Sequence, residues 1–102
     1  MDDLQPALAA LGHATRLAIV RAIFDSADGT ATPSAIAEAI GIQRNLLSAH
    51  LLILERAGLV LAEQQGRNRI LRLNGARMAE VGAAVISLSG GPSDEVAPSP
   101  GR

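Results

Sequence analysis

Apolar residues recur along the first third of the chain at the three- and four-residue spacings of helices. Leu4, Leu8 and Leu11 predict a short amphipathic helix that ends at Gly12. Thr15 is the expected N-cap of a second helix. The apolar side chains of that second helix are Leu17, Ile19, Val20, Ile23 and Phe24. The composition of residues 25–29, DSADG, then predicts a loop.

A third helix and a fourth follow, separated by a two-residue turn. Thr32 can cap the third helix, with Pro33 at its first position, where a missing N–H costs nothing. Gly41 ends it, after a buried side formed by Ile36, Ala37 and Ile40. The fourth helix is expected over residues 43–57, with Gly58 as its C-terminal cap.

The fourth helix has two distinct arcs when its residues are placed 100° apart. The arc expected to be buried holds Leu46, Leu47, His50, Leu51, Ile53, Leu54 and Ala57. The opposite arc holds Arg44, Asn45, Ser48, Ala49, Leu52, Glu55 and Arg56. The second arc is polar apart from Ala49 and Leu52, and is therefore the one expected to face outward.

Two short strands are predicted next, over residues 59–64 and 69–73, with the turn at residues 65–68. A last helix over residues 76–89 spaces its apolar residues by three and four, which makes a narrow seam for packing against another helix. The seam residues are Met78, Val81, Val85 and Leu88. Residues 90–102, rich in Pro, Gly and Ser, are expected to form a disordered tail after a single domain over residues 1–89.

The expected fold is mainly α with a small β-hairpin, in the order α-α-α-α-β-β-α. Two helices joined by a short turn containing glycine are typical of a helix-turn-helix. A hairpin with arginine near its tip, directly after the second of those helices, is typical of a winged helix. In that arrangement the second helix enters the major groove of DNA and the hairpin, or wing, follows the backbone.

Composition removes several other classes of protein. The chain of 102 residues has no cysteine, which excludes disulfides, thiolate metal sites and a cysteine nucleophile. No apolar run approaches the length of a membrane span, and the N-terminus is acidic where a signal peptide needs positive charge. We therefore expect a cytoplasmic protein without a membrane partner. No arrangement of residues indicates an enzyme.

The formal net charge of −1 at first argues against a nucleic-acid partner. Its distribution reverses that view. Residues 44–77 hold six Arg and two Glu, a net charge of +4, whereas residues 1–43 hold two Arg and five acidic residues, a net charge of −3. The basic segment coincides with the fourth helix and the wing, where positive charge would meet phosphates.

Three stretches of the chain resemble the ArsR/SmtB-type winged-helix transcriptional regulators. They are ALGHATRLAIVRAI (residues 10–23), SAIAEAIGIQRNLLSAHLLILERAGLV (34–60) and the wing GRNRILRLN (66–74). The resemblance implies a homodimer formed through the first and last helices, which binds a palindromic operator, in most members as a repressor. The interface residues would be Leu4, Leu8, Leu11, Met78, Val81, Val85 and Leu88.

Side chains at the start and on the outward arc of the fourth helix are the candidates for DNA contact. Arg44 suits guanine, Asn45 suits adenine, and Ser48 lies beside them. Gln43 either caps the helix or reaches a phosphate. On the wing, Arg67, Asn68 and Arg69 are expected to contact the backbone or the minor groove, while Arg72 either joins them or pairs with Glu63.

Ala49 and Leu52 depart from the resemblance, because relatives often carry a basic or polar residue there. Leu52 either contacts thymine methyl groups, docks a protein, or is covered by helix packing. The alternative function is accordingly a winged-helix module that binds another protein.

Metal sensing is not expected. The positions that match the family's cysteine pair are Thr32 and Ser34, and the last helix offers only Glu80 as a hard donor. His50 is expected to have a structural, hydrogen-bonded role, and His13 to serve the start of the second helix. We expect no cofactor, and any signal to act elsewhere on the chain or through a partner protein.

Overall fold

The computed structural model describes residues 4–88, in the element order α1-α2-β1-α3-α4-β2-β3-α5. The helices are α1 (Gln5–Leu11), α2 (Ala14–Asp25), α3 (Pro33–Ile40), α4 (Arg44–Arg56) and α5 (Gly75–Leu88). The strands are β1 (Thr30–Ala31), β2 (Val60–Gln65) and β3 (Asn68–Leu73). The predicted fold class is confirmed. The predicted tail, residues 90–102, and Ser89 lie outside the described residues.

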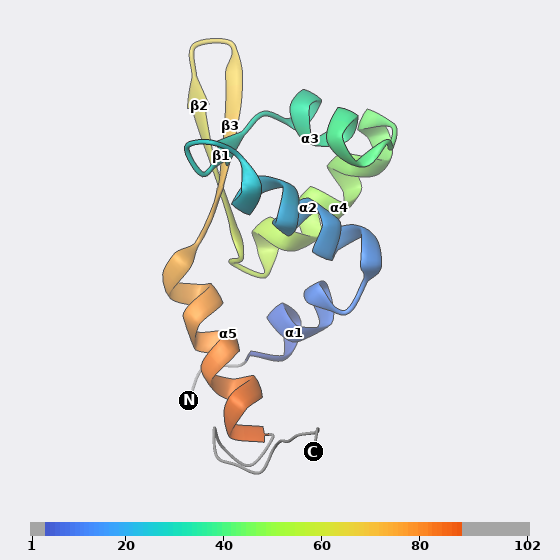
Figure 1. Cartoon of the computed structure of the whole chain (residues 1–102). Coiled ribbons are helices and arrows are strands. Elements are labelled where there is room, and N and C mark those ends of the chain that lie inside the picture. Colours follow the sequence, from blue (N-terminus) through green and yellow to red (C-terminus); the bar gives the residue numbers. More distant parts are fainter. Residues whose placement is uncertain (1–3, 89–102) are drawn as a thin grey trace, which may run out of the picture.

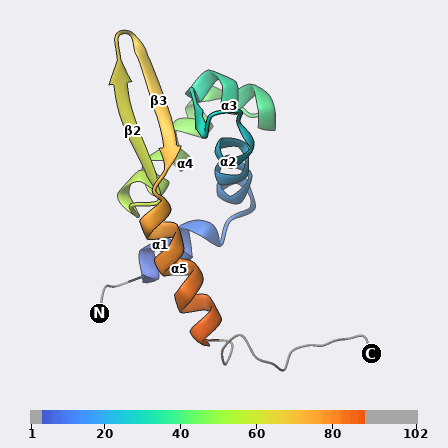
Figure 2. The ribbon, with the colours of Figure 1, turned by 60° about the vertical axis from the view of Figure 1, so that its left-hand side comes forward.

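The helices α1 to α4 form one body, and the β2–β3 hairpin and α5 project from it in opposite directions (Figures 1 and 2). The core is aliphatic and is drawn from every helix and from strands β2 and β3, while Ala31 of β1 packs partly against it. Its largest fully buried side chains are Ile19, Ile23, Ile36, Leu47, Leu51, Leu54, Leu59, Leu71 and Val60.

One strand escaped prediction. β1 forms an edge of the antiparallel sheet, whose order is β1-β3-β2, with Thr30 opposite Arg72 and Ala31 opposite Leu71. Two residues are too few to show the alternation that identifies a strand in sequence. The hairpin is also tighter than expected, because Gln65 and Asn68 pair with each other and leave only Gly66 and Arg67 in the turn.

The start of α2 differs from the prediction. His13, and not Thr15, is the N-cap: its backbone is extended, and its Nδ1 accepts a hydrogen bond from the Thr15 N–H at 3.1 Å. Thr15 is therefore already the second helical residue. The expected role of His13 at the start of this helix is confirmed, in the form of a side-chain cap.

Fewer apolar side chains of the first two helices are buried than the sequence predicts. In α1, Ala7 and Ala10 are fully buried, while the three leucines pack only partly against the core. Small side chains allow the close approach of α1 to α2 and α4, so the longer leucines lie at the flanks. In α2, Leu17 and Phe24 lie seven residues apart on a solvent-facing side, and Phe24 is 71% exposed.

The predicted caps of α3 are observed, and α4 (Arg44–Arg56) is one residue shorter at each end than the predicted 43–57. Thr32 Oγ1 accepts a hydrogen bond from the Ala35 N–H at 3.2 Å, and Pro33 is the first residue of α3. Gly41 adopts φ +73°, the left-handed conformation that ends α3 and turns the chain into α4. Gly58, at φ +79°, ends α4 in the same manner, since the Leu59 N–H donates to the Leu54 carbonyl at 3.0 Å.

Asn74 joins the end of the hairpin to α5 and was not singled out from the sequence. Its Nδ2 donates to the Gly58 carbonyl at 2.9 Å, and its backbone N–H donates to the Leu59 carbonyl at 2.9 Å. Its Oδ1 accepts from the Arg77 N–H at 3.2 Å in the first turn of α5. One side chain thus connects the end of α4 to the start of α5.

Candidate nucleic-acid interface

Every position within α4 that is predicted to contact DNA is exposed. Arg44, Asn45, Ser48, Ala49 and Leu52 are all exposed, and Leu52 at 46% is not covered by packing within residues 4–88. This removes one of the three explanations for Leu52. Two remain: contact with thymine methyl groups and contact with a protein.

The predicted buried arc of α4 is wider than the observed one. Leu47, Leu51, Leu54 and Ala57 are buried, whereas Leu46 and Ile53 are more than two-fifths exposed. The helix packs on α1, α2, α3 and β2 along a single sector that includes Leu47 and Leu54, and Leu46 and Ile53 lie to one side of that sector. These two side chains give α4 an exposed apolar flank, separate from Leu52 on the outward arc.

Gln43 is the N-cap residue of α4 but makes no capping hydrogen bond with its side chain. Its backbone carbonyl accepts from the Leu47 N–H at 2.9 Å, as the N-cap position requires. Of the two roles considered for Gln43, side-chain capping is therefore not observed, and the exposed amide remains available for a phosphate.

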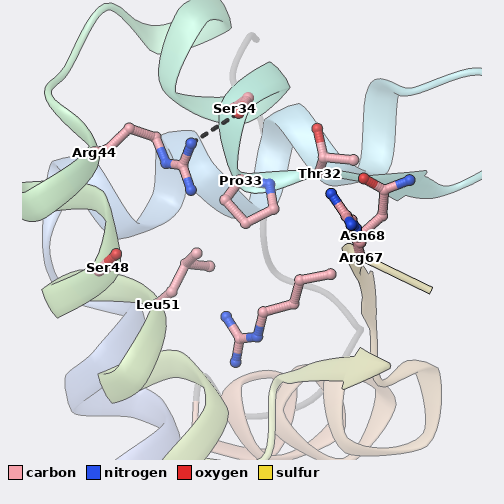
Figure 3. A pocket seen from close by; sticks show the side chains of 9 residues that line it. Thr32, Pro33, Ser34, Arg44, Ser48, Leu51, Arg67 and Asn68 are labelled. Atoms are coloured by element: carbon pink, nitrogen blue, oxygen red, sulfur yellow. Dashed lines mark hydrogen bonds between the residues drawn. The ribbon is translucent and has the colours of Figure 1, made fainter. Parts of the chain in front are cut away.

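A hollow of about 290 Å³ lies between the start of α3, the outward side of α4 and the wing (Figure 3). The residues that line it are Thr32, Pro33, Ser34, Arg44, Ser48, Leu51, Arg67, Asn68 and Arg69. Five of the nine residues predicted for DNA contact therefore share one surface. Gln43, Asn45, Ala49 and Leu52 do not line the hollow.

Arg44 reaches from α4 across to the first turn of α3. Its Nη1 donates to Ser34 Oγ at 2.8 Å (Figure 3). Because a hydroxyl is neutral, this contact orients the guanidinium group without cancelling its charge. Ser34 thus orients Arg44 while Thr32 caps α3; these are the two residues that the resemblance matches to a cysteine pair.

The three arginines of the wing differ in their surroundings. Arg69 Nη2 donates to both carboxylate oxygens of Glu55 on α4, at 2.7 and 2.6 Å. Arg72 lies opposite Leu61 in the sheet while Glu63 lies opposite Ile70, and no ion pair joins Arg72 to Glu63 within residues 4–88. Arg67 is at the turn and exposed.

The middle of α4 contacts a cluster of two imidazoles and a guanidinium group, in which His50 is the residue from α4. Arg16 Nη1 lies 3.3 Å from His50 Nδ1, and Arg16 Nε donates to the Ala10 carbonyl at 2.6 Å. The ring centroids of His13 and His50 are 4.7 Å apart. Since guanidinium has only donors, His50 Nδ1 must accept. The expected hydrogen-bonded role of His50 is thus seen in the contact that joins α1, α2 and α4.

Burial, and then the neighbouring His13 and Arg16, lower the pKa of His50 below its usual range. A protonated ring would lose its acceptor at Nδ1 and would face two neighbours that are cationic or able to become so. The neutral ring is therefore the form that fits this cluster.

Most of α5 is uncovered in the single chain. Val81 is buried and Met78 packs partly against the core, whereas Val85 and Leu88 are exposed, Leu88 by 80%. Glu80 accepts from Arg77 Nη1 at 3.0 Å. Across residues 4–88, no group of three or more His, Asp or Glu side chains lies close enough to hold a metal ion.

No single helix in the described part of the chain is long and apolar enough to cross a membrane. The helices α1 and α2 reach that length and composition only when taken together, and they meet at an angle of 90°.

The comparisons with known proteins agree with this geometry. The model of a family described as a helix-turn-helix domain matches residues 11–62, just over half of the chain. A comparison with curated proteins finds no match.

Solved structures match most of the chain. One is the homodimeric winged helix-turn-helix DNA-binding domain of a possible ArsR-family transcriptional regulator from Mycobacterium bovis, which is 30% identical. The match covers 83% of this chain and 76% of the Mycobacterium bovis chain, with a TM-score of 0.66. An ArsR-like transcriptional regulator from Rhodococcus sp. RHA1 is 26% identical over 85% of this chain and 78% of its own, with a TM-score of 0.72.

The transcriptional repressor BigR from Xylella fastidiosa is 25% identical over 81% of this chain and 82% of its own, with a TM-score of 0.64. The family match, the solved structures and the wing beside an arginine-lined hollow all indicate a winged helix-turn-helix protein. The chain belongs to the ArsR family of winged helix-turn-helix transcriptional regulators, which bind DNA and are not enzymes.

Proposed function

We propose that this protein is a homodimeric regulator that binds a palindromic operator with α4 in the major groove and the wing on the backbone or in the minor groove. The observation that carries the proposal is the shared hollow, which brings Arg44 and Ser48 of α4 together with Arg67 of the wing. Direct base contacts and phosphate contacts would then arise from one continuous surface.

Within this proposal the residues have separate roles. Arg44 and Asn45 read bases, and Ser48 and the methyl-bearing Ala49 and Leu52 complete the groove contact. Gln43 and the wing residues Arg67 and Asn68 contact the backbone or the minor groove, and Arg69 lies beside them with its charge balanced by Glu55. DNA binding and dimerisation lie together in residues 1–89.

Dimerisation is supported by the apolar surface that one chain leaves open. The exposed residues of the α5 seam, Val85 and Leu88, have no cover within residues 4–88. The Mycobacterium bovis neighbour is homodimeric. A two-fold pairing through α5 and α1 would present two recognition helices about 34 Å apart, one turn of DNA.

Repression is the proposed outcome of operator binding, as in the Xylella fastidiosa repressor. The protein would act in the cytoplasm. With no thiolate in the sequence, its signal would arrive through a partner protein or another ligand.

The test is selection of duplexes from a random library by the purified protein, followed by fluorescence anisotropy at two salt concentrations. We expect enrichment of an inverted repeat with half-sites about 10 base pairs apart. Affinity should fall by roughly a thousandfold or more between about 50 and 200 mM salt. Absence of both enrichment and salt-dependent binding would contradict the proposal.

A second candidate function is a winged-helix module that docks a protein. Two exposed apolar parts of α4 favour it: the flank formed by Leu46 and Ile53, and Leu52 on the outward arc. The two functions respond differently to Leu52→Ser. Loss of a preference for thymine in the selected sequences supports groove contact, whereas unchanged DNA binding points to a protein partner.

A further inference from the structure

The carboxylate of Glu55 lies on the outward arc of a helix that is proposed to meet DNA. A free carboxylate there would repel phosphates. Both of its oxygens instead accept from Arg69 Nη2, at 2.7 and 2.6 Å, and the Glu55 side chain is only 22% exposed. The pair is therefore more sheltered than the Arg21–Asp25 pair, whose side chains are both more than half exposed.

The charges around the hollow are consequently unequal. Arg44 contacts the neutral hydroxyl of Ser34, and Arg67 makes no ion pair within residues 4–88. Arg69 alone among the three has its charge balanced by a carboxylate. The hollow thus presents two uncompensated positive charges, although three arginines line it.

The same pair is the side-chain link between the recognition helix and the wing. Glu55 lies in the last turn of α4, and Arg69 lies near the start of β3, opposite Gln64. No other side-chain hydrogen bond connects α4 to the hairpin in the described part of the chain. This contact therefore adds to the burial of Val60 and Leu71 in the core in setting the position of the wing relative to α4.

We propose that Glu55 determines the specificity of DNA binding. By holding Arg69, it fixes the wing against α4 and withholds one positive charge from the DNA backbone. Phosphate contacts strengthen binding to any sequence, whereas base contacts distinguish sequences. A weaker backbone contribution then leaves a larger share of the affinity to the base-reading residues of α4. Arg69 is in this view a positioning residue of the wing. The inference rests on the proposed function.

The experiment compares Glu55→Gln with wild type on two probes. These are a duplex selected from the random library by the wild-type protein, and a shuffled duplex of the same composition. Glu55→Gln is expected to raise the affinity for the shuffled duplex about fivefold at low salt. It should also steepen the slope of log K against log salt by about 0.9, the value for one more phosphate contact. The affinity for the selected duplex should change by less than about twofold.

Glu63→Gln is the matched control, because it removes the same charge from an exposed position on β2 of the same wing. It is expected to change both affinities by less than about twofold. If the two variants raise the affinity for shuffled DNA equally, net charge alone explains the effect and the proposal is wrong.

The double variant Glu55→Gln/Arg69→Gln tests the positioning role, since it removes the pair without changing net charge. We expect its affinity for the shuffled duplex to return to the wild-type value, while its preference for the selected duplex stays reduced. A wild-type preference in the double variant would overturn the positioning role. If the wild-type protein selects no duplex at all, the proposed function fails before this inference is reached.

Discussion

The β2–β3 hairpin precedes Asn74 in the sequence and α5 follows it, and the two extend to opposite ends of the molecule (Figures 1 and 2). Residues 60–73 hold three Arg and one Glu. Residues 75–88 hold one Arg and one Glu, which pair with each other. The hairpin thus exposes charge, and α5 exposes aliphatic side chains, among them Val85 and Leu88.

This contrast separates two tasks in space. Charged surface attracts DNA over a distance set by salt, whereas apolar surface drives association of chains by its burial. A substitution in the hairpin should therefore change DNA binding without changing dimerisation, whereas a substitution in the exposed part of α5 should change dimerisation directly. The predictions below use that separation, from the largest expected effect to the smallest.

Val85→Glu should give the largest effect, because it places a charge in the exposed seam of α5. Sedimentation equilibrium should show a monomer at concentrations where wild type is a dimer. Affinity for the selected palindromic duplex should fall by roughly a hundredfold, since two linked half-sites would become independent. The control is Ala83→Glu, an exposed position on the opposite side of the same helix. Equal effects of the two substitutions would remove the seam from the interface.

Arg44→Ala should lower the affinity for the selected duplex by roughly tenfold to a hundredfold, the loss expected for a base contact of about 1–3 kcal/mol. Affinity for the shuffled duplex should change much less. Arg21→Ala, an exposed arginine on α2 that does not line the hollow, is the control. An equal loss on both duplexes would make Arg44 a phosphate contact. Anisotropy titrations measure all four values.

Arg67→Ala should weaken binding to both duplexes alike, by roughly threefold to tenfold at low salt, because a backbone contact carries no sequence information. The slope of log K against log salt should become shallower by about 0.9. Oligomeric state should not change, in contrast to Val85→Glu. A loss confined to the selected duplex would instead place Arg67 on a base edge in the minor groove.

The cluster around His50 lies between the two ends and predicts a smaller, pH-dependent effect. The pKa of His50 is lowered in the folded chain, so the unfolded chain binds more protons between that value and the ordinary one near 6.5. Stability from this group is present above that range and is lost as the pH falls through it. Urea unfolding at several pH values should show a smaller free energy on acidification.

His50→Gln should weaken this dependence and cost up to about 1 kcal/mol at pH 8, because an amide oxygen replaces the imidazole nitrogen that contacts Arg16. The variant retains a group that can accept a hydrogen bond but cannot titrate in this range. Unchanged pH dependence in the variant would exclude His50 as the group responsible.

Local signals in the sequence were sufficient for the helix-turn-helix. Thr32, Pro33 and Gly41 act through their own backbone and nearest neighbours, and each has the predicted role. The periodicity of α4 predicts burial less completely. It shows which residues share a face, but only the packing of neighbouring elements decides how much of that face is covered, and Leu46 and Ile53 stay exposed.

Contacts between distant residues could not be predicted in this way. Glu55 and Arg69 are fourteen residues apart, and Asn74 and Gly58 are sixteen. Each pair requires the hairpin to fold back beside α4, which depends on the register of β2 and β3. The sequence indicated that Arg69 belongs to the wing, but the partner that balances its charge appears only in the fold.

The hydrogen bonds of Asn74 have a mechanical consequence. Through its side chain the Gly58 carbonyl, just after the recognition helix, and the Arg77 N–H, in the first turn of α5, meet at one residue. In a dimer that pairs through α5, Asn74 would be the hinge about which each recognition helix rotates relative to the dimer interface. A rotation of a few degrees there would change the span between the two helices, and with it the match to the pitch of DNA, while each domain stays internally unchanged.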